Sequence, residues 1–119
     1  MSLSIKAELN ADVNELARAT TLNVLKGVVL ATPRDTGRAK GNWQVSISGP
    51  INTQTELLDL TGRLAINKGL VKILAAKTVK NPVFWVTNNL PYIEGLNAGT
   101  STQAPAKFVE TVIKQVTNG

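Results

Sequence analysis

The sequence predicts an α+β domain, with a long N-terminal helix and a C-terminal helix packed on a small antiparallel sheet. Apolar residues recur at spacings of three and four between positions 9 and 28, which is typical of an amphipathic helix. Apolar and polar residues alternate strictly over 43–48, and a β-branched and aromatic run fills 83–86, so both stretches are predicted strands. The residues between them are helix-compatible, so a helical excursion is expected to separate the strands.

Composition narrows the possible functions. The chain has 119 residues, which suits a single domain spanning 1–119 with a radius of gyration of roughly 13–14 Å. It contains no cysteine and no histidine, which removes disulfides, thiolate metal sites and the commonest general base. No segment approaches ~20 consecutive apolar residues, so we expect no membrane partner. The net charge of +5 keeps nucleic-acid binding as an alternative function.

The N-terminal third contains the longest predicted helix. Residues 1–10 either form a strand or lead directly into this helix, and both readings stay open. The helix is expected to start near Asn10, a good N-cap, and to end near Thr32, because Pro33 disfavours helical geometry in the residue before it. Gly27 is a predicted weak point, since glycine costs about 1 kcal/mol relative to alanine inside a helix.

Residues 32–43 form a predicted structured turn, because proline and glycine punctuate them. This is the most basic short segment of the chain, with Arg34, Arg38 and Lys40. One interpretation is a contact with a polyanion or a carboxylate. The other, which we favour, is a solvated loop with a local Asp35–Arg38 pair, since exposed pairs contribute only ~0–1 kcal/mol.

The stretch 55–78 is apolar around its whole helical circumference, so it has no single polar face. Two explanations are open. Gly62 and Gly69 could break it into shorter helices, or one long helix could be covered on one side by its own domain and on the other by a neighbouring subunit. The second explanation predicts an oligomer, with Leu64, Lys68, Val71 and Lys72 as candidate interface residues.

Residues 81–96 combine a strand with a sharp strand-to-helix corner. The unbroken run at 83–86 predicts that both faces of the strand are covered. Asn88 and Asn89 end the strand, and Pro91 is expected as the first residue of the next helix. A polar loop over 97–103 follows, and Pro105 is expected in the first turn of the last helix.

No pattern in the sequence indicates catalysis. We find no phosphate-binding loop, no dinucleotide turn, no metal-ligand cluster and no nucleophile elbow. We therefore expect no catalytic residue, no cofactor and no bound metal.

Three segments resemble a known family. Residues 32–43, TPRDTGRAKGNW, resemble the TPxDTGxxxxNW element of the gene-product-ten type tail-component family of tailed bacteriophages, a group of neck and tail-completion proteins. Residues 86–93, VTNNLPYI, resemble its xTNNLPYAxxLEYG element, and 99–105, GTSTQAP, resemble the start of its GxSxQAPxxxV element. The order and separations match over 32–109.

The resemblance implies a virion structural protein, without catalysis, that forms a sixfold ring at the head–tail junction. The implied partners are further copies of the chain, head-closure or connector proteins and tail terminator or tail tube proteins, with DNA in the channel contacted without sequence specificity. The implied location is the neck or tail top of the virion, after assembly in the host cytoplasm.

The resemblance also suggests that the 35–43 turn and the 88–92 corner lie together, with Trp43 and Tyr92 packed beneath polar residues that satisfy the backbone. The structural positions it implies are Asp35, Thr36, Gly37, Trp43, Asn88, Asn89, Pro91 and Tyr92. Thr100 stands where the family has tryptophan, so partner choice is expected in the 97–103 loop. The candidate interface residues outside 55–78 are Arg34, Arg38, Lys40, Thr100, Ser101 and Gln103.

Overall fold

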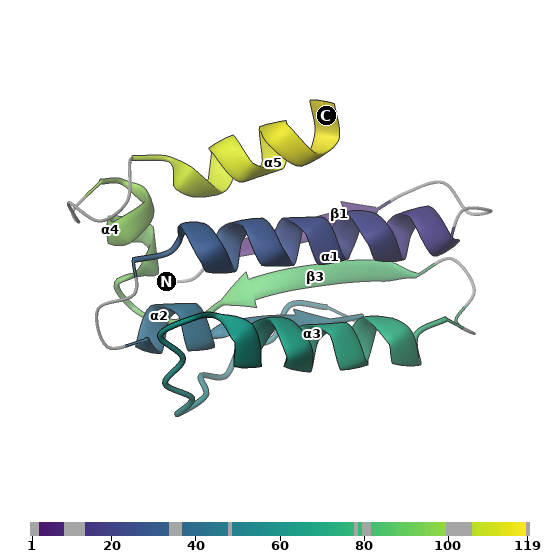
Figure 1. Cartoon of the computed structure of the whole chain (residues 1–119), viewed down its shortest axis with the longest axis horizontal. Coiled ribbons are helices and arrows are strands. Elements are labelled where there is room, and N and C mark those ends of the chain that lie inside the picture. The colour runs from purple at the N-terminus through teal and green to yellow at the C-terminus, as the bar shows by residue number, and fades with distance from the viewer. Residues whose placement is uncertain are drawn as a thin grey trace.

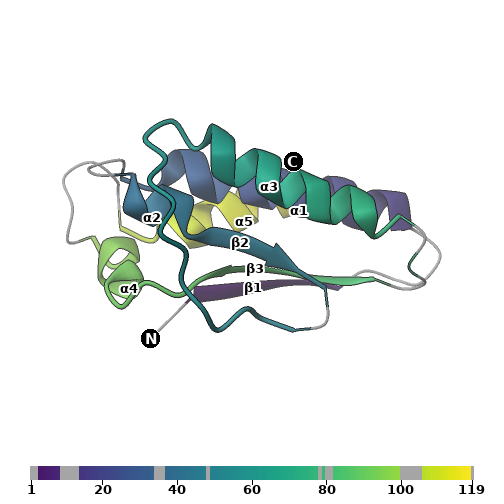
Figure 2. The same cartoon turned by 90° about the horizontal axis from the view of Figure 1, so that it is seen from below.

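A three-stranded antiparallel sheet forms one layer of the protein, and helices cover one of its faces (Figure 2). The computed structural model describes residues 3–8, 14–33, 37–47, 49–77, 79, 82–99 and 106–118. The strands are β1 (Leu3–Glu8), β2 (Trp43–Ser46) and β3 (Val83–Asn88), in the order β1-β3-β2. Both strands that the alternating and apolar patterns predict are present, and they pair directly with each other. Of the two readings of the first ten residues, the strand is correct for 3–8.

Three helices lie side by side over the sheet, with α1 (Asn14–Ala31) between α3 (Arg63–Ala75) and α5 (Phe108–Asn118) (Figure 1). Two short helices, α2 (Arg38–Gly41) and α4 (Ile93–Asn97), lie at the turns that follow α1 and β3. The predicted α+β fold, with N-terminal and C-terminal helices and a helix between the strands, is confirmed. The radius of gyration is 13.5 Å, within the expected range.

Helix α1 is the central helix of this layer. Its 18 residues span about 27 Å, and it ends at Ala31, close to the stop predicted from Pro33. The predicted start near Asn10 lies outside the described residues. A Cβ atom at Gly27 would overlap Cγ1 of Val112 in α5. The glycine that weakens the isolated helix therefore allows α5 to pack closely against α1.

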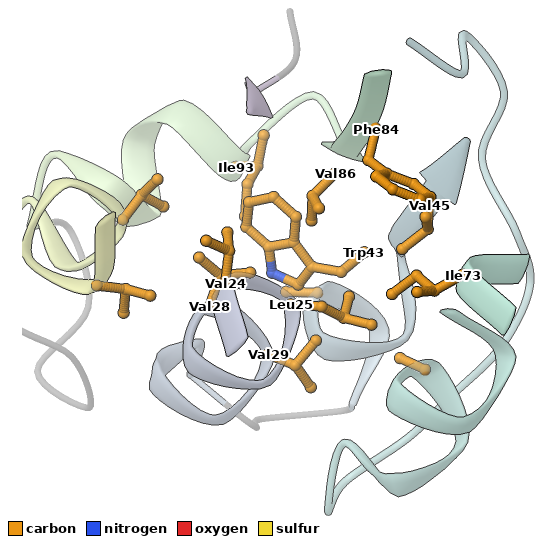
Figure 3. Packing of buried hydrophobic residues seen from close by; sticks show 14 of the residues in the cluster. Val24, Leu25, Val28, Val29, Trp43, Val45, Ile73, Phe84, Val86 and Ile93 are labelled. Atoms are coloured by element: carbon orange, nitrogen blue, oxygen red, sulfur yellow. The ribbon is translucent and has the colours of Figure 1, made fainter. Parts of the chain in front are cut away.

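The core lies between the helices and the inner face of the sheet (Figure 3). Phe84 and Val86 of β3 are fully buried, as are Leu25 and Val28 of α1. Figure 3 shows the indole of Trp43 in the middle of this cluster, between side chains from α1 and from β3. Aliphatic residues supply most of the packing, as the low aromatic content requires.

The two faces of β3 differ, so the prediction that both are covered is wrong in part. Val83 and Trp85 are only half-buried, whereas Phe84 and Val86 are inaccessible. On the side away from the helices, an extended segment over 49–60 runs past the sheet, and none of the described helices packs there (Figure 2). Thr87 is nevertheless buried on that side, where its hydroxyl accepts a hydrogen bond from Ser4 Oγ at 3.1 Å.

The puzzling stretch 55–78 contains one uninterrupted helix, α3, of 13 residues. Gly62 precedes it with φ of 84°, in the left-handed region that favours glycine. Gly69 lies within the helix and does not break it. The explanation by shorter helices is therefore wrong for Gly69. Residues 55–62 precede α3 without helical structure, and residues 76–77 follow it as a turn.

The corner after β3 differs from its prediction in one detail. Helix α4 begins at Ile93 with Tyr92 as its N-cap, so Pro91 lies in the preceding turn and is not the first helical residue. The expected position of Pro105 in the last helix lies outside the described residues. The chain still turns from strand to helix within a few residues, between Asn88 and Ile93.

Candidate interaction surface

Asn88 joins the two segments that the resemblance pairs. Its side chain is fully buried, and its Nδ2 donates to the carbonyl of Ala39 in α2 at 2.8 Å. Its Oδ1 accepts from the backbone N–H of Leu90 at 3.1 Å, which shapes the corner. Trp43 pairs with Asn88 across the sheet. The structure thus brings the end of the 32–43 turn and the start of the 88–92 corner into direct contact.

Asn42 is a second buried amide, which the sequence analysis did not select. Its Nδ2 donates to the carbonyls of Arg38 at 2.9 Å and Thr55 at 3.1 Å, and its Oδ1 accepts from the N–H of Thr55 at 2.9 Å. This side chain therefore fastens the extended 49–60 segment to α2. Only its place in the TPxDTGxxxxNW element distinguishes it in the sequence from a surface asparagine.

Trp43 is 2% exposed, and its Nε1 donates to Thr32 Oγ1 at 2.8 Å. The Thr32 hydroxyl in turn donates to the carbonyl of Val28, one of the last carbonyls of α1. A buried indole N–H needs such a partner. The first and last residues of the TPRDTGRAKGNW segment are therefore bonded to each other.

Lys40 is not an exposed interface residue, and this prediction is wrong. It is 5% exposed, and its Nζ donates to the carbonyls of Val29 at 2.7 Å and Leu30 at 3.0 Å. These carbonyls belong to the last turn of α1, where a cation is favoured by the helix dipole and free acceptors need donors. The ammonium is thus used in folding. We call Lys40, Asn42, Trp43 and Asn88 the corner cluster.

The remaining predicted residues of the turn and the corner differ in how deeply they are buried. Gly37 is buried, and its carbonyl accepts from the N–H of Asp59 at 3.0 Å. Asn89 is half-buried, and its Nδ2 donates to the carbonyls of Ile51 and Thr53. Tyr92 is 46% exposed, so the prediction that it packs beneath the corner is wrong. Pro91 is exposed as well.

Several predicted residues cannot be compared with the structure. Arg34, Asp35, Thr36, Thr100, Ser101 and Gln103 lie outside the described residues. Arg38 is half-exposed, with its Nη2 3.5 Å from Gln54 Oε1.

Asp59 fixes where α3 begins, and sequence reasoning missed it. It is 4% exposed, and its carboxylate accepts from the N–H groups of Gly62 at 3.0 Å and Ala65 at 2.9 Å. These are donors that the first turn of a helix leaves free. An aspartate three residues before a glycine could have indicated this cap.

The outward side of α3 exposes large aliphatic side chains. Leu64 is 51% exposed, Val71 68% and Leu74 54%, whereas Ala65 and Ile73 on the inward side are each 2% exposed. We call Leu64, Val71 and Leu74 the outer α3 face. Three further exposed leucines lie at the end of α1 and just before α3, namely Leu30, Leu58 and Leu60. Two of the four predicted interface residues of this stretch, Leu64 and Val71, belong to the outer α3 face.

The other two, Lys68 and Lys72, line a small pocket between α3 and β2. Its internal volume is about 50 Å³. The other lining residues are Gly41, Trp43, Gln44, Val45, Ala65 and Gly69. A Cβ at Gly69 would overlap Cδ2 of Leu25, so this glycine lets α3 lie close to α1.

The described residues contain neither a cluster of side chains suited to hold a metal ion nor a helix long and apolar enough to cross a membrane. Comparison with protein-family models, with curated proteins and with solved structures returned no match. Within the described residues, two features stand out: exposed aliphatic side chains on α3, and a buried, hydrogen-bonded corner.

Proposed function

We propose that this chain is a structural protein of a tailed-bacteriophage virion, located at the head–tail junction. It forms a sixfold ring that completes the top of the tail and joins it to the head connector, and it performs no catalysis. Copies of the chain contact one another within the ring, and connector and tail proteins contact it from above and below. The proposal takes its biological setting from the resemblance of residues 32–43, 86–93 and 99–105 to phage tail-completion proteins.

The proposal of an assembly function rests on the outer α3 face. Leu64, Val71 and Leu74 lie on one helix and each exposes more than half of its surface. Fully burying one such side chain is worth about 1.5–3 kcal/mol, so covering these half-exposed groups contributes a few kcal/mol per contact. Large apolar side chains exposed together on one helix are typical of a protein–protein contact.

The corner cluster supports the same proposal in a second way. Segments far apart in the sequence, which resemble two elements of one family, meet through the Asn88–Ala39 hydrogen bond and the Trp43–Asn88 strand pair. The residues that carry the resemblance thus serve a common scaffold, as expected if relatives share a fold and differ in their docking surfaces.

The alternative, a nucleic-acid-contacting accessory protein that uses the basic 34–40 turn, is less favoured. It needs a cluster of free cations. The Lys40 ammonium is buried against the end of α1, and this removes one of the three.

Electron microscopy of virions made without this chain tests the proposal. We expect disruption of its gene to leave filled heads and separate tails in the lysate, and expect the wild-type gene supplied in trans to restore joined particles. A gene carrying Leu64→Asp should not restore them, whereas one carrying the control Gln115→Glu, exposed on α5 away from α3, should. Normal numbers of joined particles after the disruption would contradict the proposal.

A further inference from the structure

The exposed surface of α3 has two distinct halves. At about 100° per residue, Leu64 and Val71 fall within 20° of each other, whereas Lys68 and Lys72 are displaced toward the side that faces β2. Only this second half borders the pocket. The lysines therefore form a site of their own beside the outer α3 face.

The pocket is the right size for the end of one side chain. Its volume of about 50 Å³ exceeds the space that a single water needs, and it is far smaller than the roughly 300–1,000 Å³ of sites for drug-sized ligands. Trp43 and Val45 supply apolar walls, and Gln44 adds an amide. A nucleotide or a cofactor does not fit, whereas a carboxylate on a short stem does.

The charge that α3 places beside the pocket is positive. Arg63, Lys68 and Lys72 are the ionisable residues of α3, and α2 and β2 contribute no carboxylate. Within the described part of the chain, neither the Lys68 nor the Lys72 ammonium makes a hydrogen bond or an ion pair. Like charges four residues apart on a helix repel each other, so a carboxylate placed between them relieves this repulsion.

We propose that the Lys68–Lys72 pocket binds a glutamate or aspartate side chain from an acidic segment of a different protein. A second copy of α3 would bring only further cations, and the chain as a whole carries +5. The apolar walls of the pocket favour a polypeptide over a nucleic acid, because a phosphate backbone has no apolar groups to cover them. The site concerns the same helix as the proposed subunit contact but rests on the pocket and its charges alone.

A titration followed by NMR tests this site in the full chain. The probe is a short peptide of alternating leucine and glutamate, compared with the same peptide carrying glutamine. Addition of the glutamate peptide should shift the indole N–H of Trp43 and the amides of Gln44 and Gly69, and the effect should weaken as salt is added. Equal shifts with the glutamine peptide would overturn the proposal.

Two pairs of variants make the test specific. The double variant Lys68→Gln/Lys72→Gln should bind the glutamate peptide about tenfold more weakly, whereas Lys26→Gln/Lys114→Gln, with the same change in charge on α1 and α5, should bind as the wild type does. A short DNA duplex that binds more tightly than the peptide, and loses affinity in Lys68→Gln/Lys72→Gln, would replace the acidic protein by a nucleic acid and overturn the proposal.

The outcome is separable from that of the proposed function. Both lysine variants should keep the oligomeric mass of the wild type, because the subunit contact is assigned to Leu64 and Val71. Peptide binding by a chain that does not assemble would refute the ring and keep the pocket. Assembly without peptide binding would refute the pocket and keep the ring.

Discussion

The corner cluster buries polar groups, whereas the outer α3 face exposes apolar side chains to solvent. In the corner, an ammonium, two amides and an indole N–H are buried, and each donates to a carbonyl or hydroxyl oxygen. On the outer α3 face, three aliphatic side chains are exposed to solvent, with two lysines beside them. The polar groups of the first region are satisfied within the fold, whereas the apolar groups of the second remain exposed.

The corner cluster should therefore contribute to folding stability, and the outer α3 face to binding a partner. A buried polar group costs free energy unless it is hydrogen-bonded, so the corner cluster is stable only as a complete set. An exposed leucine costs the isolated chain little, and its burial is favourable as soon as a partner covers it. Substitutions in the two regions should therefore change different measurable quantities.

Trp43→Ala should have the largest effect on stability. It removes a fully buried indole from the centre of the core together with its bond to Thr32, and we expect the free energy of unfolding to fall by about 3–5 kcal/mol. Urea denaturation followed by circular dichroism measures this. The matched control is Tyr92→Ala, on a half-exposed ring, for which we expect less than about 1 kcal/mol. Equal losses for the two would contradict the assignment of Trp43 to the core.

Asn88→Ala should have the next largest effect. It leaves the carbonyl of Ala39 and the N–H of Leu90 without their partner in a buried place, which costs about 1–3 kcal/mol. Asn67→Ala, on the exposed side of α3, should change the unfolding free energy by no more than about 0.5 kcal/mol. A neutral Asn88→Ala would show that the corner does not depend on this amide.

Lys40 and Lys68 should differ in how much each contributes to the free energy of unfolding. Lys40→Met removes the ammonium that caps α1, and a loss of about 1–2 kcal/mol is expected. Lys68→Met changes an exposed side chain, and its effect should stay within about 0.5 kcal/mol. Thermal unfolding of the two variants in parallel measures this difference in stability. If both were neutral, Lys40 would have to be regarded as a surface residue.

Periodicity predicted the fold well, since it depends on local patterns. The alternation over 43–48 and the apolar run at 83–86 identified two of the three strands, and the three-four spacing identified α1. The lack of a polar face over 55–78 predicted either a broken helix or a helix covered on two sides. The structure has one helix with exposed apolar residues, and its cover by a neighbouring subunit stays a prediction. The glycines were harder, because the roles of Gly27 and Gly69 depend on what packs against them.

Polar residues were predicted less well for a physical reason. Charge alone suggested that Lys40 is exposed, but an oxygen-lined helix end eleven residues earlier in the chain accepts its ammonium. Asn42 and Asp59 were missed because their partners are backbone groups, which are the same at every position of a sequence. The resemblance suggested that Tyr92 packs beneath the corner, whereas its side chain is 46% exposed.

The central claim is that the outer α3 face is covered by a neighbouring copy of the chain. The most direct measurement is the mass of the protein in solution, by light scattering during size-exclusion chromatography. We expect the wild-type mass to be a higher multiple of 12.7 kDa, and the mass of Leu64→Ser/Val71→Ser to be 12.7 kDa, with the two proteins equally folded. A wild-type protein that remains at 12.7 kDa, or a double variant that assembles as the wild type does, would contradict it.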